Sequence, residues 1–155
     1  MSSSRRETGR SLSSILLTGI GSLLALLLVF GQTLAVFNYD LTVAWGLQES
    51  EMEVGKVGIA YAKGFGFGDT LIYLPLLLAG LFGLFERKKW AIFPMFGALA
   101  ITAYWPLVCL YAVLVDKAAI TFTTDKYITY AILLPLISIY GLWGMWLILR
   151  KRESI

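Results

Sequence analysis

The residue of this sequence best suited to chemistry is an acid at the expected edge of a membrane-spanning helix. Asp69 follows the glycine-rich stretch 64–68 and precedes a charge-free apolar run that ends at Phe85. A span of about 20 residues counted back from Phe85 would place Asp69 a few ångströms inside the outer membrane boundary. Ionisable groups at such depth are costly and often functional. Tyr73, one helical turn further on, shares its face, so the two side chains could bind a cation or accept a proton.

Other interpretations of these residues stay open. Aspartate is a preferred N-cap, and a cap at Asp69 would be structural. The glycines of 64–68 lack the strand–turn–helix context of a phosphate loop, so we interpret them as backbone that approaches a neighbour closely. Asp40, in the preceding polar segment, is a second candidate for binding a ligand or ion. The three glutamates within 49–53 either hold a cation loosely or form a solvated acidic face.

The absence of some residue types excludes several chemistries within this chain. The sequence has no histidine and one cysteine, Cys109. Histidine-ligated haem, zinc or copper, histidine acid–base catalysis and an intrachain disulfide are therefore excluded. Cys109 lies in an apolar run and is interpreted as a small buried hydrophobe. No nucleophile–base pair is visible, and we predict no metal site and no cofactor.

The composition is typical of a membrane protein. Of 155 residues, 58% are hydrophobic and 15% are charged, whereas soluble domains have about 45–50% and about 25%. A chain this short cannot bury so much apolar surface in a water-soluble core. The net charge of +3 is divided among separate positions, which argues against a nucleic-acid surface. We therefore predict a single all-α, multi-pass domain in the plasma membrane, which is the inner membrane if the cell is prokaryotic.

Four apolar runs have lengths that suit helices crossing a bilayer. The predicted helices cover residues 12–37, 66–85, 90–115 and 127–149, after a cytoplasmic tail at 1–11, with outer loops at 38–65 and 116–126. The start of the chain also resembles a signal peptide, although its apolar run exceeds the usual stretch of about 7–15 residues. Within the longer loop, residues 52–61 fit either a strand or a short interfacial helix.

Basic residues indicate which side faces the cytoplasm. One side carries nine of them in three clusters, and the other side carries four lysines. The positive-inside rule therefore predicts an antiparallel bundle with both ends in the cytoplasm. The clusters are Arg5, Arg6 and Arg10, then residues 87–89, then residues 150–152.

Three prolines lie within the predicted spans, at Pro75, Pro106 and Pro135. Each removes a backbone hydrogen bond and lies about 9–15 Å below the outer end of its helix by helical rise. Kinks there would splay the outer halves into an outward-facing cavity. Proline is also simply common in membrane helices, so both interpretations stay open.

Small residues recur on the second and fourth helices, at Gly80, Gly83, Gly141 and Gly144. Small faces let membrane helices pack closely, either within one bundle or against a partner. Both helices also contain Leu-Pro-Leu before the glycines and a basic cluster after them, which indicates either a weak internal repeat or chance likeness.

These features favour a non-enzymatic accessory or assembly subunit of a larger membrane complex. The alternative is a small oligomeric transporter or channel with an outward-facing cavity near Asp69, and a third possibility is a membrane enzyme acting on lipid or quinone. The expected partners are the lipid bilayer and other membrane helices, in a homo- or hetero-oligomer.

Overall fold

Helices account for nearly all of the chain that the computed structural model describes, which is residues 12–115 and 120–152, with the backbone alone for the last two. No strand occurs in these ranges. Four helical stretches are long and apolar enough to cross a membrane: Leu12–Phe37, Glu51–Phe85, Lys89–Val115 and Thr124–Arg150. The prediction of an all-α chain with four candidate spans is therefore confirmed. The predicted tail at 1–11 lies outside the described residues.

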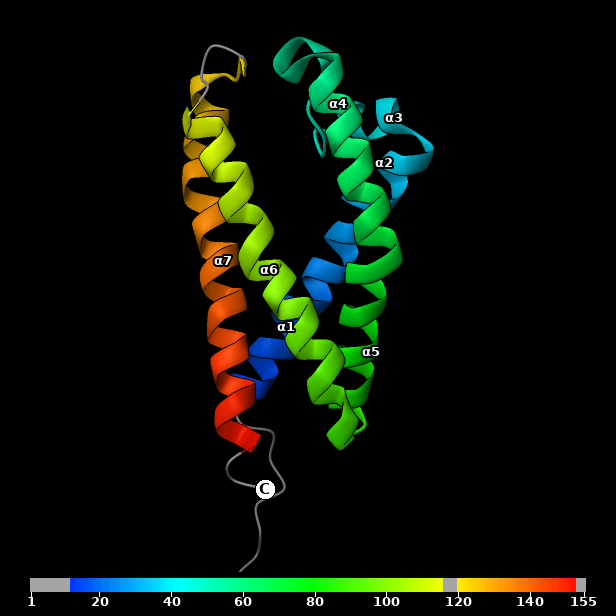
Figure 1. The fold of residues 1–155 in the computed structure, drawn as a ribbon, viewed down its shortest axis with the longest axis vertical. Coiled ribbons are helices and arrows are strands. Elements are labelled where there is room, and N and C mark those ends of the chain that lie inside the picture. Colours follow the sequence, from blue (N-terminus) through cyan, green and yellow to red (C-terminus); the bar gives the residue numbers. More distant parts are fainter. Residues whose placement is uncertain (1–11, 116–119, 153–155) are drawn as a thin grey trace, which may run out of the picture.

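Two of the four stretches contain a π-helical turn. The first stretch comprises α1 (Leu12–Leu27), the π turn η1 (Leu28–Thr33) and α2 (Leu34–Phe37), and the short helix α3 (Tyr39–Ala44) follows. The second comprises α4 (Glu51–Gly68), the π turn η2 (Asp69–Tyr73) and α5 (Leu74–Phe85). The 3₁₀ turn η3 (Lys89–Ala91) leads into α6 (Ile92–Val115), and α7 (Thr124–Arg152) follows. Figure 1 shows how these helices are arranged.

The second stretch begins much earlier than residue 66, where the sequence analysis placed it, so most of the predicted loop 38–65 is helical. Its start is fixed by a capping box, in which the Ser50 N–H donates to Glu53 Oε2 over 2.8 Å. Gly55 then adopts a φ of +67°, which changes the helix direction after its first turn. Residues 52–61, for which the sequence fitted either a strand or a short helix, are helical. Beyond the kink at Gly55, residues 56–85 measure about 45 Å at 1.5 Å per residue, still longer than a hydrocarbon core of about 30 Å.

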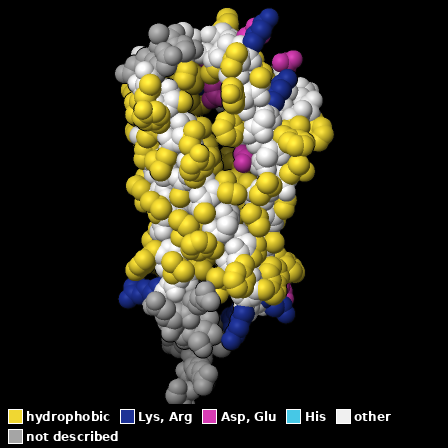
Figure 2. Space-filling view, in the orientation of Figure 1, with side chains coloured by type: hydrophobic (Ala, Val, Ile, Leu, Met, Phe, Trp, Pro, Cys, Tyr) yellow, Lys and Arg dark blue, Asp and Glu magenta, His cyan; other side chains and the backbone are white. Residues whose placement is uncertain are grey.

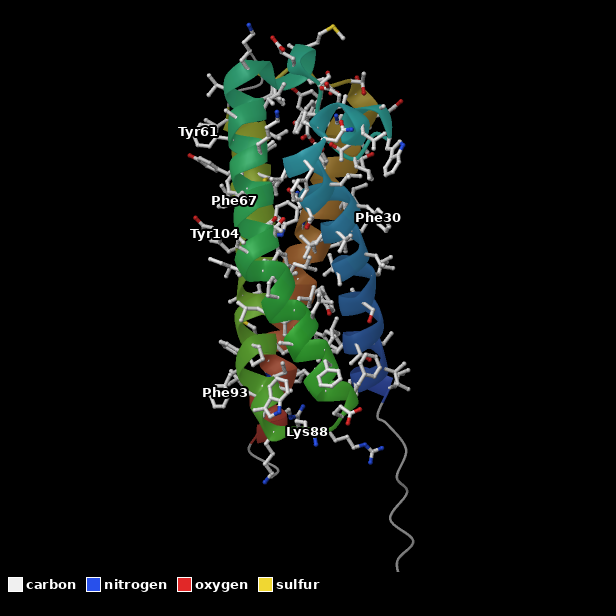
Figure 3. The ribbon with its side chains drawn as sticks, turned by 90° about the vertical axis from the view of Figure 1, so that its right-hand side faces the viewer. Phe30, Tyr61, Phe67, Lys88, Phe93 and Tyr104 are labelled. Atoms are coloured by element: carbon white, nitrogen blue, oxygen red, sulfur yellow. The ribbon has the colours of Figure 1, made fainter. Side chains whose placement is uncertain are left out.

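The two ends of the bundle differ in charge. The start of α1, the turn between α5 and η3, and the end of α7 all lie at one end, where Figure 2 shows basic side chains. Lys88 marks this end in Figure 3. Helix α3 and the start of α4 lie at the opposite end. The cluster at Arg5, Arg6 and Arg10 lies outside the described residues.

The surface along the bundle is apolar, as a lipid-facing surface requires. Figure 3 shows Phe30, Phe67, Phe93 and Tyr104 pointing away from the helices that carry them. Each of these four side chains is at least half exposed. Large apolar groups left outside a bundle of this kind are solvated by lipid tails.

Close helix contacts form at the four glycines that the sequence analysis singled out. A Cβ at Gly80 would lie 2.7 Å from Met95 Cα, and one at Gly141 would lie 2.6 Å from the Ala103 nitrogen. A Cβ at Gly83 would lie 2.6 Å from Ala91 Cβ, and one at Gly144 would lie 2.8 Å from Leu99 Cδ2. All four glycines therefore let helices of the same chain approach one another, α5 against the η3–α6 stretch and α7 against α6.

Helix α4 diverges from α6 in the half of the molecule that contains α3 (Figure 1). There α4 packs mainly against η1 and α2, whereas α6 and α7 pack against each other and α5 packs against α6. Pro106 lies within α6 and Pro135 within α7, while Pro75 is the second residue of α5, just after η2. The Leu74 N–H bonds to the Asp69 carbonyl, which is the i→i+5 pairing of a π turn.

Candidate functional site

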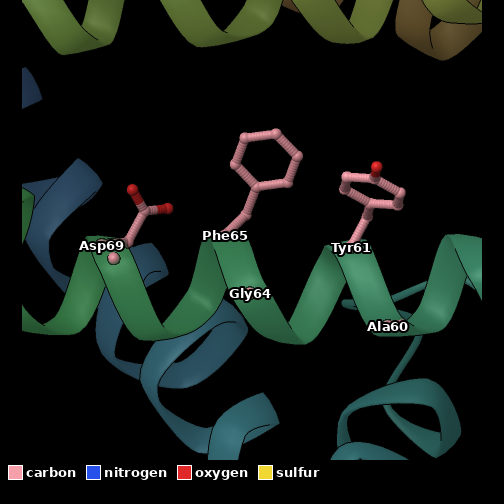
Figure 4. A pocket seen from close by; sticks show the side chains of 6 residues that line it. Ala60, Tyr61, Gly64, Phe65 and Asp69 are labelled. Atoms are coloured by element: carbon pink, nitrogen blue, oxygen red, sulfur yellow. The ribbon is translucent and has the colours of Figure 1, made fainter.

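A cavity of about 510 Å³ opens along one face of α4 and η2. Its lining residues recur at steps of three and four, which places them on one side of the helix. They are Ala60, Tyr61, Gly64, Phe65, Gly68 and Asp69. Figure 4 shows Tyr61 and Phe65 of α4 and Asp69 of η2 pointing toward α6, and Figure 2 shows the molecule hollowed in this half, with acidic side chains inside the hollow.

Asp69 lies in the middle of a continuous helical stretch, so the interpretation of Asp69 as an N-cap is wrong. The helix is capped by Ser50, well before this point. Asp69 is half-buried and faces the cavity. Among the described residues it forms no ion pair and no side-chain hydrogen bond. Its carboxylate is therefore available to a bound group.

Tyr73 contacts α6 and forms no hydrogen bond with Asp69. Its hydroxyl lies 2.6 Å from Thr102 Oγ1, and Thr102 in turn donates to the Ala98 carbonyl over 2.8 Å. Since the Thr102 proton is used in that second bond, Tyr73 is the donor of the first. Tyr73 and Thr102 are both fully buried. One turn further along than Asp69, this contact joins η2 to α6.

The segment 49–53, which lies before the cavity-lining part of α4, is joined by several contacts to the start of α7 and the residues just before it. The Tyr130 hydroxyl donates to the Glu49 carboxylate. Lys126 forms an ion pair of 2.8 Å with Glu53, and Thr121 donates to two backbone carbonyls of the same segment. We call these contacts the roof. The sequence gives no signal for them because the partners are far apart along the chain.

Tyr39 supports the roof from α3. Its hydroxyl donates to the Glu49 backbone carbonyl over 3.0 Å. Burial, together with the nearby charge of Glu49, raises the pKa of Tyr39 to about 12. The hydroxyl therefore keeps its proton, and remains a donor, throughout the physiological range.

The two π turns lie against each other beside the cavity. Thr70 and Thr33 share a hydrogen bond of 3.0 Å. A Cβ at Gly66 would lie 2.8 Å from the Gln32 carbonyl, so the expected close backbone approach in 64–68 holds at Gly66. Gly64 and Gly68 have open space instead. π turns are rare and often occur at functional sites.

The other candidate, Asp40, is exposed in the first turn of α3 and does not line the cavity. Cys109 is half-buried in α6, within electrostatic range of both Glu49 and Asp69. Across residues 12–115 and 120–152, no three acidic or thiol side chains come together as a metal site.

The cavity therefore combines one unpaired carboxylate, two aromatic rings and a strip of small residues. An arrangement of this kind can hold a ligand by charge and by apolar contact, and it contains no evident nucleophile with a base. No family model matches this chain, and comparison with curated proteins and with solved structures finds no similar protein.

Proposed function

We propose that this chain is a non-enzymatic membrane protein that binds a cation at Asp69, in a cavity of its outer half, as a small carrier or receptor does. The observation that carries the proposal is the Asp69 carboxylate, half-buried and without an ion pair or side-chain hydrogen bond among the described residues. A carboxylate kept unpaired at membrane depth costs stability. Such a cost is typical of a functional site, where activity is gained at the expense of stability.

The charges around the cavity favour a positive ligand. The Glu49 side chain adds a second acidic group on the outer side of the cavity. Glu49 and Asp69 both lie within electrostatic range of Cys109. Lys126, the lysine of the roof, is paired with Glu53, and neither Glu49 nor Asp69 forms an ion pair among the described residues. In an environment of low dielectric constant, acids without an ion pair attract cations.

The proposed orientation has both ends of the chain in the cytoplasm, so that the cavity opens toward the outer side. Its support is the basic end of the bundle, at Arg87, Lys88 and Lys89, opposite the end with α3. We further propose that Pro106 and Pro135 bend α6 and α7 outward. The divergence of α4 from α6 in the same half of the molecule supports this bend.

The expected role as an accessory subunit loses one of its supports. It rested partly on small residues that could meet a partner helix, but Gly80, Gly83, Gly141 and Gly144 pack within the chain. The cavity is more specific evidence of function than the presence of four helices is. We therefore prefer a ligand-binding role, with a partner helix as the second candidate for the occupant.

A cation-dependence experiment tests this proposal. The full chain is reconstituted in nanodiscs, and its thermal unfolding is followed in sodium, potassium or tetraphenylphosphonium chloride at constant ionic strength. A ligand that binds the folded state raises the unfolding temperature in proportion to its occupancy. We expect at least one cation to stabilise the parent, and Asp69→Asn to remove that effect. Asp40→Asn, which deletes an exposed acid outside the cavity, is the matched control.

If the parent and the Asp69→Asn variant respond identically to all three cations, the proposal is wrong. A response that Asp40→Asn also abolishes would indicate non-specific charge screening, and it would count against the site equally.

A further inference from the structure

We infer that the cation taken by the cavity is organic and amphiphilic, with its charge at Asp69 and a compact apolar body against Phe65 and Tyr61. The inference rests on the proposed function and goes beyond it, because it names the class of ligand. The relevant observation is the stripe of side chains on α4, which combines a carboxylate with aromatic rings one and two turns away.

The two aromatic rings are accessible for contact. Tyr61 is 68% exposed and Phe65 is 49% exposed, although both project toward the cavity. Faces of aromatic rings attract organic cations, and quaternary ammonium groups are commonly recognised in this way. The rings and the carboxylate together therefore suit a positive charge attached to apolar groups.

The adjacent stripe of the helix leaves room for the body of such a ligand. Ala60, Gly64 and Gly68 form it, and a Cβ at either glycine would meet nothing within 4 Å. The volume of about 510 Å³ lies within the range of roughly 300–1,000 Å³ found for small-molecule sites. It far exceeds the space that a bare alkali cation needs.

The ligand set argues against a bare metal ion. Divalent cations in proteins take several oxygen ligands, including more than one carboxylate in most sites. Here a single carboxylate lines the cavity, and no metal-binding group of three occurs among residues 12–115 and 120–152. A single acid beside aromatic rings suits one diffuse positive charge instead.

The open side of the cavity indicates how the ligand arrives. On the outer side of the cavity-lining residues the roof joins the chain before α4 to α7, through Tyr130–Glu49 and Lys126–Glu53, and on their inner side Tyr73 and Thr102 join η2 to α6. The hollow in Figure 2 lies on a side of the bundle, parallel to its long axis. Counted back about 20 residues from Phe85, the outer boundary of the hydrocarbon core falls beside the cavity, so an amphiphile held at the outer interface reaches the cavity from the side.

A phospholipid is a poorer fit than a compact amphiphile. Along its helical stretch, Asp69 lies further from the end of the molecule that contains α3 than Phe65 and Tyr61 do. The charged end of the ligand is therefore its deeper end, whereas a phospholipid places its acyl chains deeper than its charged group. This order favours a compact body, such as one with several aryl groups.

Matched ions of opposite charge test the inference. Binding of tetraphenylphosphonium and of tetraphenylborate is measured by titration calorimetry on the full chain in phosphatidylglycerol nanodiscs, with empty nanodiscs subtracted. The two ions each carry four phenyl groups and differ in the sign of their charge.

Of these two ions, we expect only the phosphonium to bind saturably. Tetramethylammonium, which has the charge but lacks the apolar body, should bind more weakly than the phosphonium by about tenfold or more. Phe65→Ala should weaken phosphonium binding by about threefold to tenfold, whereas Phe30→Ala, on the lipid-facing surface, should not.

The possible failures are distinguishable. Equal affinity for tetramethylammonium, or a sodium effect as large as that of the phosphonium, overturns the amphiphile and leaves the cation site in place. Equal binding of tetraphenylborate shows that only apolar contact matters and overturns the inference. If phosphonium binding weakens when phosphatidylethanolamine replaces half of the lipid, a lipid ammonium group occupies the site, and the inference of a compact ligand is overturned. If no cation binds and Asp69→Asn has no effect, the proposed function fails as well.

Discussion

The side-chain amide of Gln48 donates a hydrogen bond of 2.8 Å to the backbone carbonyl of Gly31. Gly31 lies in the π turn η1, where the usual i→i+4 ladder is interrupted and a carbonyl needs an outside partner. Gln48 is buried and immediately precedes the segment 49–53 that forms the roof. This bond therefore attaches the roof to the first span, beside the cavity.

Loss of that bond should destabilise the protein. Gln48→Ala leaves the Gly31 carbonyl buried without its donor, which costs about 1–3 kcal/mol of unfolding free energy. Unfolding of the detergent-solubilised protein, followed by circular dichroism, measures the effect. Gln32→Leu is the control, because the buried amide oxygen of Gln32 has no hydrogen-bond partner among the described residues and its removal therefore breaks no bond at that atom. Equal losses in both variants would contradict a specific role for the Gln48 bond.

Overpacking at Gly141 should separate α6 from α7. A methyl group there would lie 2.6 Å from the Ala103 backbone nitrogen, which cannot move without moving the helix. We expect Gly141→Ala to lower the free energy of unfolding by about 1–3 kcal/mol. Gly19→Ala meets nothing within 4 Å, so it should be neutral or slightly stabilising through helix propensity. The same unfolding assay compares them, and a stable Gly141→Ala protein would refute the close contact.

The contact between Tyr73 and Thr102 should appear as an energetic coupling. Tyr73→Phe, Thr102→Val and the double variant form a thermodynamic cycle whose interaction energy reports on the pair. For a buried neutral hydrogen bond of 2.6 Å we expect a coupling of about 0.5–1.5 kcal/mol. Additive losses would mean that the two hydroxyls do not bond in the membrane.

Removal of the Asp69 charge should stabilise the folded protein even as it removes the site. The carboxylate is half-buried without a partner among the described residues, so Asp69→Asn relieves an uncompensated charge. We expect the unfolding free energy to rise by on the order of 1 kcal/mol in the absence of ligand. Asp40→Asn, at an exposed position, should leave it unchanged. A destabilised Asn variant would indicate that the carboxylate has a structural task.

Orientation in the membrane can be measured directly. In a Cys109→Ala background, single cysteines at positions 88 and 56 are treated with a membrane-impermeant maleimide in intact cells. Both positions are exposed at opposite ends of the bundle. The proposed orientation requires labelling of Lys56→Cys and protection of Lys88→Cys until the cells are broken. Labelling of position 88 in intact cells would reverse the bundle and direct the cavity inward.

Only part of the site could be predicted from the sequence. Asp69 stands out because a charge beside an apolar run is a local feature. The pairing expected between Asp69 and Tyr73 does not form, because the packing of η2 directs Tyr73 to Thr102 on α6. Phe65 and Tyr61 join the site only because α4 is helical above Asp69, which glycines at alternate positions concealed.

The sequence by itself determined the number of candidate spans and the absence of histidine chemistry within this chain. The length of each apolar run is sufficient to identify a candidate span, because in lipid each span must satisfy its own backbone hydrogen bonds as a helix. The tertiary structure alone decided which helices meet. Contacts such as Tyr130 with Glu49, 81 residues apart, depend on how α4 and α7 are placed and rotated. Those rotations follow from the fit of side chains between helices, at positions such as Gly80 against Met95, which no single segment encodes.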